Sequence, residues 1–132
     1  MPLVRSLHHI NFVVRDINAA KMRFAAQLGL EFGASEELPA RGVVTVRARL
    51  AETWIVLVQP VTSAGVVAGR LAAHGEGVFL LSFAVPDLEQ ARTLFPQLGH
   101  TRTGLDGWQV ADLPHAVANR AEPVVLQLCE SA

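Results

Sequence analysis

The chain has 132 residues, of which 51% are hydrophobic and 17% are charged, and its formal net charge at pH 7 is −1. This length supports one domain with one main core, and the near balance of charge argues against nucleic acid, since phosphate binding needs a basic surface. No apolar run reaches the roughly 18 residues of a membrane span, and the first residues lack the apolar core of a signal peptide.

The first predicted elements are a strand and a helix. Residues 7–14 read LHHINFVV, in which apolar and other residues alternate as they do in a strand. Asp16 is a suitable N-cap for the helix INAAKMRFAAQL that follows it. Gly29 stands where a glycine in the left-handed conformation commonly ends a helix. The opening of the chain therefore predicts a strand followed by a capped helix.

The same order of elements returns in the second half of the chain. Residues 78–85 read VFLLSFAV and predict a strand, and Asp87 is placed to cap a second helix. Gln90, three residues further on, could complete a capping box. The helix is expected to continue through Phe95 to Gly99, although a proline at position 96 should shorten or kink it.

Each half has room for further strands after its helix. In the first half they are expected at about residues 30–37 and 43–50, and in the second at about residues 100–104 and 107–112. The segment VTSAGVVAGRLAAH, residues 61–74, predicts a helix that joins the halves. With a last strand in each half, the predicted order is βαβββ, helix, βαβββ.

The two halves align at a constant shift of 71 positions. This shift relates Asp16 to Asp87 and Phe24 to Phe95 in the predicted helices. It also places WIVLV, residues 54–58, on VLQLC at the end of the chain. Agreement in a helix and in a distant last strand indicates an internal duplication.

The predicted fold class is α+β. Two βαβββ repeats are expected to form a cup-shaped, mostly antiparallel sheet around a cleft, with the helices on the outer face. The chain is interpreted as a single domain over residues 1–132. Its parts are repeat one at about 5–60, a linking helix at about 61–75, and repeat two at about 77–130.

Strand alternation predicts which side chains face the cleft. On the first strand Ile10 and Phe12 should face the helix, while His9 and Asn11 face the cleft. The expected ligand-binding residues are His9, Asn11, Thr45, Trp54, Val56, Leu80, Ser82 and Gln127. An apolar cavity with a few polar groups is typical of a small-molecule pocket. Arg47 and Arg49 share this face and are expected to be solvated, although at a cleft mouth they could meet an anionic ligand.

These segments resemble the vicinal oxygen chelate superfamily, which includes glyoxalase I, bleomycin-resistance proteins, extradiol dioxygenases and methylmalonyl-CoA epimerase. LHHINFVVRDINAAKMRFAAQLGLEF is similar to the opening strand and helix of that superfamily. SAGVVAGRLAAHGEGVFLLSFAVPDLEQA resembles a stretch of the epimerase branch, and PVVLQLCE resembles its last strand. The resemblance covers nearly the whole chain and implies the same fold.

The resemblance implies metal ligands at His9, Val56, Leu80 and Gln127. His9 is a good ligand and the amide of Gln127 a weak one, but Val56 and Leu80 cannot bind a metal. A catalytic zinc site normally needs three protein ligands, and His8, as the neighbour of His9 on a strand, should point to the opposite face. We therefore expect no metal cofactor, with at most a weakly bound divalent ion at His9 and Gln127.

Three functions stay open at this point. The first is a bleomycin-resistance-like protein that binds a small, largely apolar molecule, which the superfamily resemblance suggests is a homodimer. The second is a metal-free isomerase, lyase or cyclase in which His9 is the general acid or base, since an unperturbed histidine titrates near pH 6.5. The third, a metal-dependent epimerase or glyoxalase, is disfavoured because Thr45 and Gln127 stand where the epimerases carry carboxylates. The single cysteine, Cys129, excludes an internal disulfide and fits a cytoplasmic protein.

Overall fold

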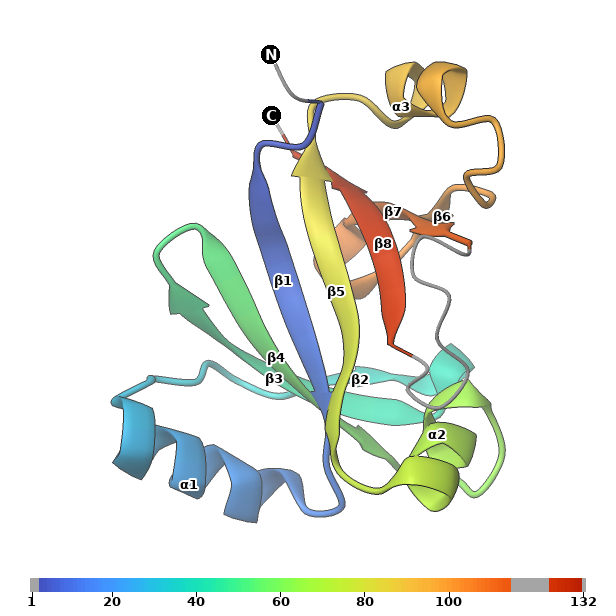
Figure 1. Ribbon diagram of the computed structural model, residues 1–132. Coiled ribbons are helices and arrows are strands. Elements are labelled where there is room, and N and C mark those ends of the chain that lie inside the picture. Colours follow the sequence, from blue (N-terminus) through green and yellow to red (C-terminus); the bar gives the residue numbers. More distant parts are fainter. Residues whose placement is uncertain (1–2, 115–123, 132) are drawn as a thin grey trace. The chain divides into compact units, whose positions relative to one another are not determined.

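A computed structural model describes residues 3–114 and 124–131 of the chain. The chain divides into two compact units. Unit one contains the residues up to His9 and from Leu80 onward, and unit two is Ile10–Phe79. The boundaries lie inside two strands, β1 (Ser6–Val13) and β5 (Gly77–Val85), so each unit contains part of both strands (Figure 1).

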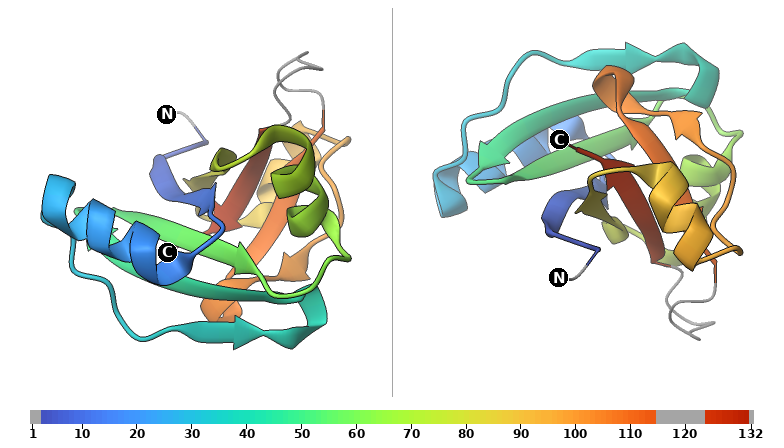
Figure 2. Two further views of the ribbon diagram at one scale, coloured as in Figure 1. Left: turned by 90° about the horizontal axis from the view of Figure 1, so that it is seen from below. Right: turned by 90° about the horizontal axis from the view of Figure 1, so that it is seen from above.

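Unit two contains the first repeat after the start of β1, together with the linking helix. Its strand order is β2-β3-β4-β1, and the pairs β2–β3 and β3–β4 are antiparallel. Helix α1 packs against β3 and β4, as Figure 2 shows, and α2 packs against β4. Its elements after β1 are α1 (Ile17–Leu28), β2 (Glu36–Leu38), the short 3-10 helix η1 (Pro39–Arg41), β3 (Val43–Leu50), β4 (Thr53–Pro60) and α2 (Val66–His74).

The predicted ends of α1 are confirmed. The Asp16 carboxylate accepts hydrogen bonds from the backbone N–H groups of Asn18 at 3.0 Å and Ala19 at 3.1 Å. Gly29 ends the helix with φ 68°, in the left-handed region that glycine adopts without a steric cost. The aromatic rings of Phe12 and Phe24 meet 5.2 Å apart beneath the helix. Local capping and the apolar stripe therefore specify the same helix.

The strand predicted at residues 30–37 is mostly wrong. Only β2 forms there, preceded by a single bridge between Phe32 and Ala48 and by a hydrogen bond from Gly33 N–H to the carbonyl of Arg47 at 3.0 Å. The intervening residues Gly33, Ala34 and Ser35 are small and exposed, so burial of their side chains does not stabilise further strand pairing.

Unit one contains the start of β1 and the second repeat from Leu80 onward. Its strand order is β1-β5-β8-β7-β6. Strands β5 and β8 are parallel, whereas β7 is antiparallel to both β8 and β6. Its further elements are α3 (Leu88–Leu94), β6 (Arg102–Thr103), the 3-10 helix η2 (Leu105–Gly107), β7 (Gln109–Leu113) and β8 (Val125–Glu130). The predicted α+β class and the two βαβββ repeats are confirmed.

Helix α3 is shorter than the sequence predicts. Asp87 caps it as expected, accepting from Glu89 N–H at 2.8 Å and Gln90 N–H at 3.4 Å. The helix ends at Leu94, and Phe95, predicted to lie within it, lies outside it with 47% of its surface exposed. The proline that follows explains the early end, because proline disfavours a helical conformation at the preceding residue.

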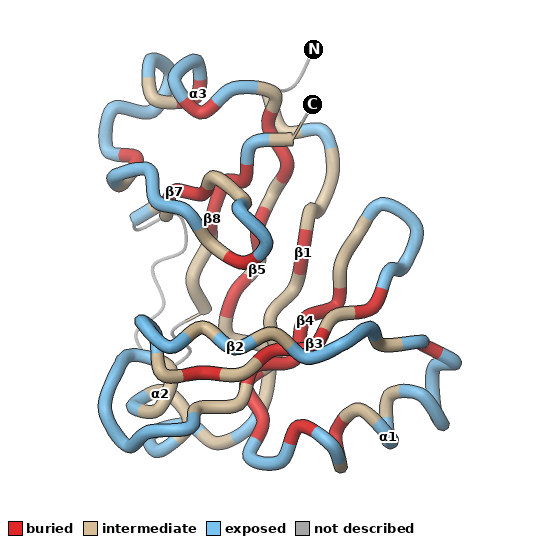
Figure 3. The backbone as a smooth tube through the Cα atoms, turned by 180° about the vertical axis from the view of Figure 1, so that it is seen from behind, coloured by how far each residue is buried: buried red, intermediate tan, exposed pale blue. Residues whose placement is uncertain are grey.

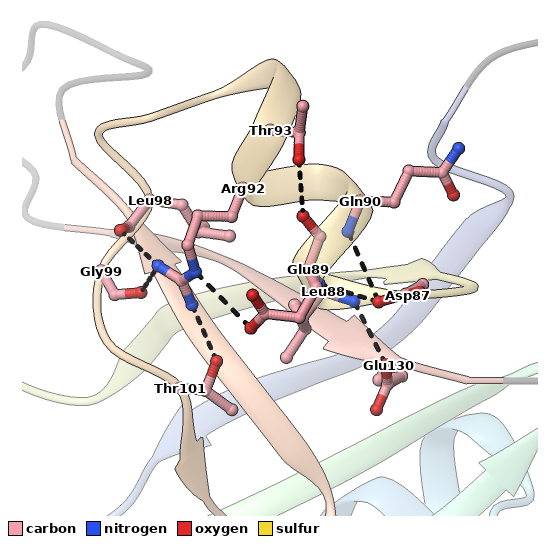
Figure 4. A network of polar contacts seen from close by, with 10 residues as sticks. All are labelled: Asp87, Leu88, Glu89, Gln90, Arg92, Thr93, Leu98, Gly99, Thr101 and Glu130. Carbon is pink, nitrogen blue, oxygen red and sulfur yellow. Dashed lines mark hydrogen bonds and ion pairs between the residues drawn. The ribbon is translucent and has the colours of Figure 1, made fainter.

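The loop after α3 is held by one arginine (Figure 4). Nη1 of Arg92 donates to the carbonyls of Leu98 at 2.9 Å and Gly99 at 2.8 Å, and Nη2 donates to Oγ1 of Thr101 at 2.8 Å. Nε of Arg92 also lies 3.7 Å from a carboxylate oxygen of Glu89. These bonds return the chain to the sheet and let Leu98 join the core beneath the helix.

The core of each unit packs between its strands and one helix, α3 in unit one and α1 in unit two. Figure 3 marks buried residues in these two helices and along the strands. In unit one the core consists of Val85, Leu88, Ala91, Leu98, Ala111 and Leu128. In unit two it consists of two clusters beneath α1: Val14, Ile17, Ala20, Val46 and Leu57, and Leu30, Ala48 and Ile55. Among the described residues, no helix has the length and apolar character needed to cross a membrane.

Candidate functional site

A row of polar side chains crosses unit one on the face opposite α3. Phe83 and Leu128 pack with α3, so alternation turns Ser82 and Gln127 to the other face. The strand register places Ser82 beside Gln127 and Gln127 beside Asp112. We call these three residues, Ser82, Gln127 and Asp112, the polar row.

The inner end of the polar row is buried and incompletely hydrogen-bonded. Ser82 is 0% exposed and Gln127 is 3% exposed. Nε2 of Gln127 donates to Oδ1 of Asp112 at 3.2 Å, and that same oxygen lies 3.1 Å from Nη2 of Arg102. Oγ of Ser82 has no hydrogen-bond partner within the described part of the chain. A buried polar atom without a hydrogen bond typically lowers the stability of the fold by about 1–3 kcal/mol, so a water, an ion or a ligand is expected to bind to it.

His9 lies in an aromatic cluster in the same unit. It is 4% exposed, and its ring stacks on Trp108 with centroids 4.6 Å apart. His8 meets the same indole edge-on at 4.7 Å, and its Nδ1 lies 2.8 Å from Nδ1 of His9. The expectation that His8 points away from His9 is therefore wrong. Nδ1 is close to the backbone, so two neighbouring rings that both turn toward one indole bring these atoms together.

The His9 ring is held neutral. Its pKa is lowered to about 3, chiefly because a charged imidazolium loses its hydration on burial and also because of the neighbouring His8. The side chain of Gln127 acts in the opposite direction by favouring the charged ring. At neutral pH His9 is thus a hydrogen-bonding group and a very weak base, and its acid form is not populated.

Cys129 completes a cluster of groups that could hold a metal. The candidate ligand atoms of His8, His9 and Cys129 all lie within 4.8 Å of one another. However, burial and, to a smaller extent, the charge of the adjacent Glu130 raise the pKa of the Cys129 thiol to about 12. The thiolate is the form that binds metals, so an ion would have to displace a strongly held proton here.

Unit two carries the other half of the predicted site residues. Oγ1 of Thr45 donates to the carbonyl of Glu36 at 3.2 Å, so this buried hydroxyl is satisfied. Oδ1 of Asn11 is buried and accepts no hydrogen bond from any described residue. Val56 is 1% exposed, and Trp54 has the guanidinium groups of two arginines over its ring.

The predicted residues thus fall into two groups. His9, Leu80, Ser82 and Gln127 belong to unit one, and Asn11, Thr45, Trp54 and Val56 belong to unit two. Their convergence on a single cleft stays a prediction. Sequence reasoning missed Trp108 and Asp112. Asp112 could have been found from the pairing of the last two strands, whereas no local signal in the sequence connects Trp108 with His9.

Residues 8–118 match the family model described as the Glyoxalase/Bleomycin resistance protein/Dioxygenase superfamily. This match covers most of the chain. The chain therefore belongs to this superfamily. The resemblance inferred from the quoted segments is confirmed.

Individual relatives are more distant. The ethylmalonyl-CoA/methylmalonyl-CoA epimerase of Cereibacter sphaeroides is 29% identical over 98 residues, which are 74% of this chain and 73% of that protein. The crystal structure of methylmalonyl-CoA epimerase from Mycobacterium tuberculosis is 25% identical with a TM-score of 0.84, covering 100% of this chain and 91% of that one. A Streptomyces coelicolor methylmalonyl-CoA epimerase in complex with 2-nitronate-propionyl-CoA is 20% identical, covers 98% and 99% of the two chains with a TM-score of 0.83, and shows the fold alone.

The metal positions that the superfamily implies do not fit a metal in this chain. Val56 and Leu80 are buried aliphatic residues, 1% and 7% exposed, and they offer no donor atom. What remains is one neutral imidazole and one amide, which supply no negative charge to offset a divalent ion. These four positions therefore do not supply a catalytic metal site.

Proposed function

We propose that this chain binds a small organic molecule on the face of unit one that carries His9, Trp108 and the polar row, and that it does so without a metal. The buried Oγ of Ser82, which has no hydrogen-bond partner among the described residues, carries this proposal. Its register neighbour on β8 is Gln127, whose buried side chain also interacts with His9. A ligand that hydrogen-bonds to Ser82 would remove a desolvation penalty.

The chemistry of these atoms indicates what the ligand offers. Oε1 of Gln127 can only accept a hydrogen bond, so it selects an N–H or O–H group. The hydroxyl of Ser82 can also donate, for example to a carbonyl oxygen. The indole of Trp108 and the side chain of Leu80 supply apolar contact area, which favours a largely apolar ligand body.

Binding is favoured over catalysis because the site lacks a strong base. Removal of a proton beside a carbonyl needs a base whose pKa is near the working pH, and the pKa of His9 is about 3. The carboxylate of Asp112 is engaged by Gln127 and Arg102. These restraints count against the metal-free isomerase in which His9 is the general base.

The first ligands to test follow from the relatives. Because the matching curated relative is an ethylmalonyl-CoA/methylmalonyl-CoA epimerase, acyl-CoA esters are one class. Antibiotics are the second class, because the family model includes bleomycin-resistance proteins. A homodimer and a cytoplasmic location are further parts of this proposal, and sedimentation of the purified chain tests the dimer.

The deciding experiment measures ligand binding and, separately, the exchange of the α-proton of the ester with solvent. Calorimetric titration with methylmalonyl-CoA, ethylmalonyl-CoA and bleomycin should give saturable binding for one class, and Gln127→Leu should weaken it about tenfold or more. The ester is then incubated in deuterated water and followed by NMR. Loss of its α-proton signal at a rate proportional to the concentration of this protein would overturn the binding function in favour of epimerisation. Absence of binding by both classes would count against the proposed ligand classes.

A further inference from the structure

Two arginines share one tryptophan on the face of unit two opposite α1. Val46 and Ala48 of β3 pack beneath α1, so alternation turns Arg47 and Arg49 to the other face. Trp54 on β4 is the register partner of Arg49. The Cζ atoms of Arg47 and Arg49 lie 4.5 and 4.8 Å from the centroid of its ring.

This arrangement holds two positive charges close together. Like charges on neighbouring positions of one strand face repel, and stacking on a shared indole offsets that repulsion. Two acidic residues lie close in the strand pairing, since Glu36 pairs with Thr45, two positions before Arg47, and Glu52 lies in the turn between Leu50 and Thr53. At the ring of Trp54 itself, two guanidinium groups meet.

The geometry suits recognition of an oxyanion. A guanidinium that lies over an aromatic ring uses its face, and its coplanar N–H groups keep the fork that matches a carboxylate or phosphate. Nε of Arg49 donates to the carbonyl of Ala51 at 2.7 Å, which fixes this side chain against the turn between β3 and β4. Arg49 is exposed and Arg47 is half-buried, so a ligand can approach from solvent.

We infer that Arg47, Arg49 and Trp54 form an oxyanion site that binds a carboxylate or phosphate group. The site belongs to unit two by itself and does not depend on the ligand proposed for unit one. It predicts that unit two binds a small molecule that carries a carboxylate or phosphate group.

The fluorescence of the two tryptophans can be used to measure anion binding. These are Trp54 in unit two and Trp108 in unit one. In a Trp108→Phe variant the emission comes from Trp54 alone, and the phenyl ring keeps an aromatic contact for His9. Inorganic phosphate and malonate are titrated separately, against potassium chloride at equal ionic strength. Calorimetry of phosphate binding to the unsubstituted chain checks that the reporter variant has not altered the site.

We expect a saturable change in Trp54 emission with phosphate or malonate that chloride does not reproduce. Arg47→Met and Arg49→Met should each weaken anion affinity about tenfold. Arg47→Lys should recover only part of the affinity, since an ammonium lacks the planar fork. Arg23→Met, on the exposed face of α1, is the matched control and should change nothing. A response that chloride reproduces, or one that survives the double Met variant, would overturn the site.

The two anions and the two reporters separate the remaining outcomes. Tighter binding of phosphate assigns a phosphate-bearing ligand, and tighter binding of malonate assigns a carboxylate-bearing one. In a Trp54→Phe variant, Trp108 reports on unit one instead. If an uncharged ligand changes Trp108 emission while anions leave Trp54 unaffected, the oxyanion site fails and the proposed function stands. If anions change Trp54 emission but no ligand binds to unit one, the oxyanion site is supported and the proposed function fails.

Discussion

The imidazole of His9 lies on the indole of Trp108 with an interplanar angle of 28° and a centroid distance of 4.6 Å. This contact desolvates a titratable ring, so its protonation is linked to stability. The pKa of His9 is about 3 in the folded chain, against an ordinary value of 6.5. Between these values the unfolded chain binds more protons than the folded one.

The stability of the fold should therefore fall as the pH falls from about 6.5 toward 3. Because the folded pKa is the lower one, the contribution of His9 is fully present above pH 6.5 and is lost at acid pH. From pH 7 to 4.5 the loss is about 2–3 kcal/mol. Urea unfolding of His9→Phe should show a pH dependence shallower by that amount, whereas His100→Asn, at an exposed position, should match the unsubstituted chain. Equal slopes for all three would contradict the buried neutral ring.

Removing the Ser82 hydroxyl should not destabilise the ligand-free protein. Its oxygen is buried and makes no hydrogen bond to any described residue, so Ser82→Ala should raise the free energy of unfolding by up to about 1 kcal/mol. Thr45→Val is the matched comparison, because the Thr45 hydroxyl donates to the Glu36 carbonyl and its loss should cost about 1 kcal/mol. Chemical denaturation measures both variants. A clear destabilisation by Ser82→Ala would show that the hydroxyl already has a partner, such as an ordered water.

Much of the fold could be read from local signals. Asp16, Gly29 and Asp87 mark helix ends through backbone hydrogen bonding and a left-handed turn, and the structure has each as predicted. The internal shift of 71 positions related the elements predicted in the first half to those of the second. The failures occur where such signals are weak: residues 30–37 form little strand, and Phe95 lies outside α3.

The site was less predictable because it depends on long-range contacts. Alternation correctly separated His9 and Ser82 from the side chains beneath the helices. It could not show that Trp108, far away in the sequence, covers His9, or that His8 turns toward the same ring. The predicted role of His9 as an acid or base assumed an unperturbed pKa, and burial changes that pKa.

Cys129 should be chemically inert in the folded protein. It is fully buried, and its pKa is raised to about 12, so the reactive thiolate is scarcely populated at pH 8. We expect alkylation by iodoacetamide to be slower than that of a cysteine peptide by more than about a hundredfold. Addition of urea above the unfolding midpoint should restore the peptide rate, which serves as the internal control. Fast modification without urea would mean that β8 opens readily.

Arg92 should be the main support of the loop that follows α3. Its guanidinium satisfies the carbonyls of Leu98 and Gly99 and the hydroxyl of Thr101. Arg92→Met should keep the apolar stem but lose these bonds, at a cost of about 1–3 kcal/mol. Hydrogen exchange should then rise first at the amide of Gly99, which donates to the carbonyl of Asp112. Arg23→Met again serves as the exposed control, and an equal effect of the two substitutions would rule out a specific role for Arg92.

The turn between β3 and β4 contains a correctable strain. Ala51 has φ 53°, in the left-handed region, where the Cβ atom of an L-residue costs roughly 1 kcal/mol. Ala51→Gly removes this cost but increases the freedom of the unfolded chain, so we expect a net gain of about 0.5 kcal/mol and a higher Tm. Calorimetry measures the shift, and Ala51→Val, which is β-branched, should lower the Tm. If glycine also lowers the Tm, the turn is not strained at this residue. Since the carbonyl of residue 51 anchors Arg49, anion binding at Trp54 should be retained in the glycine variant.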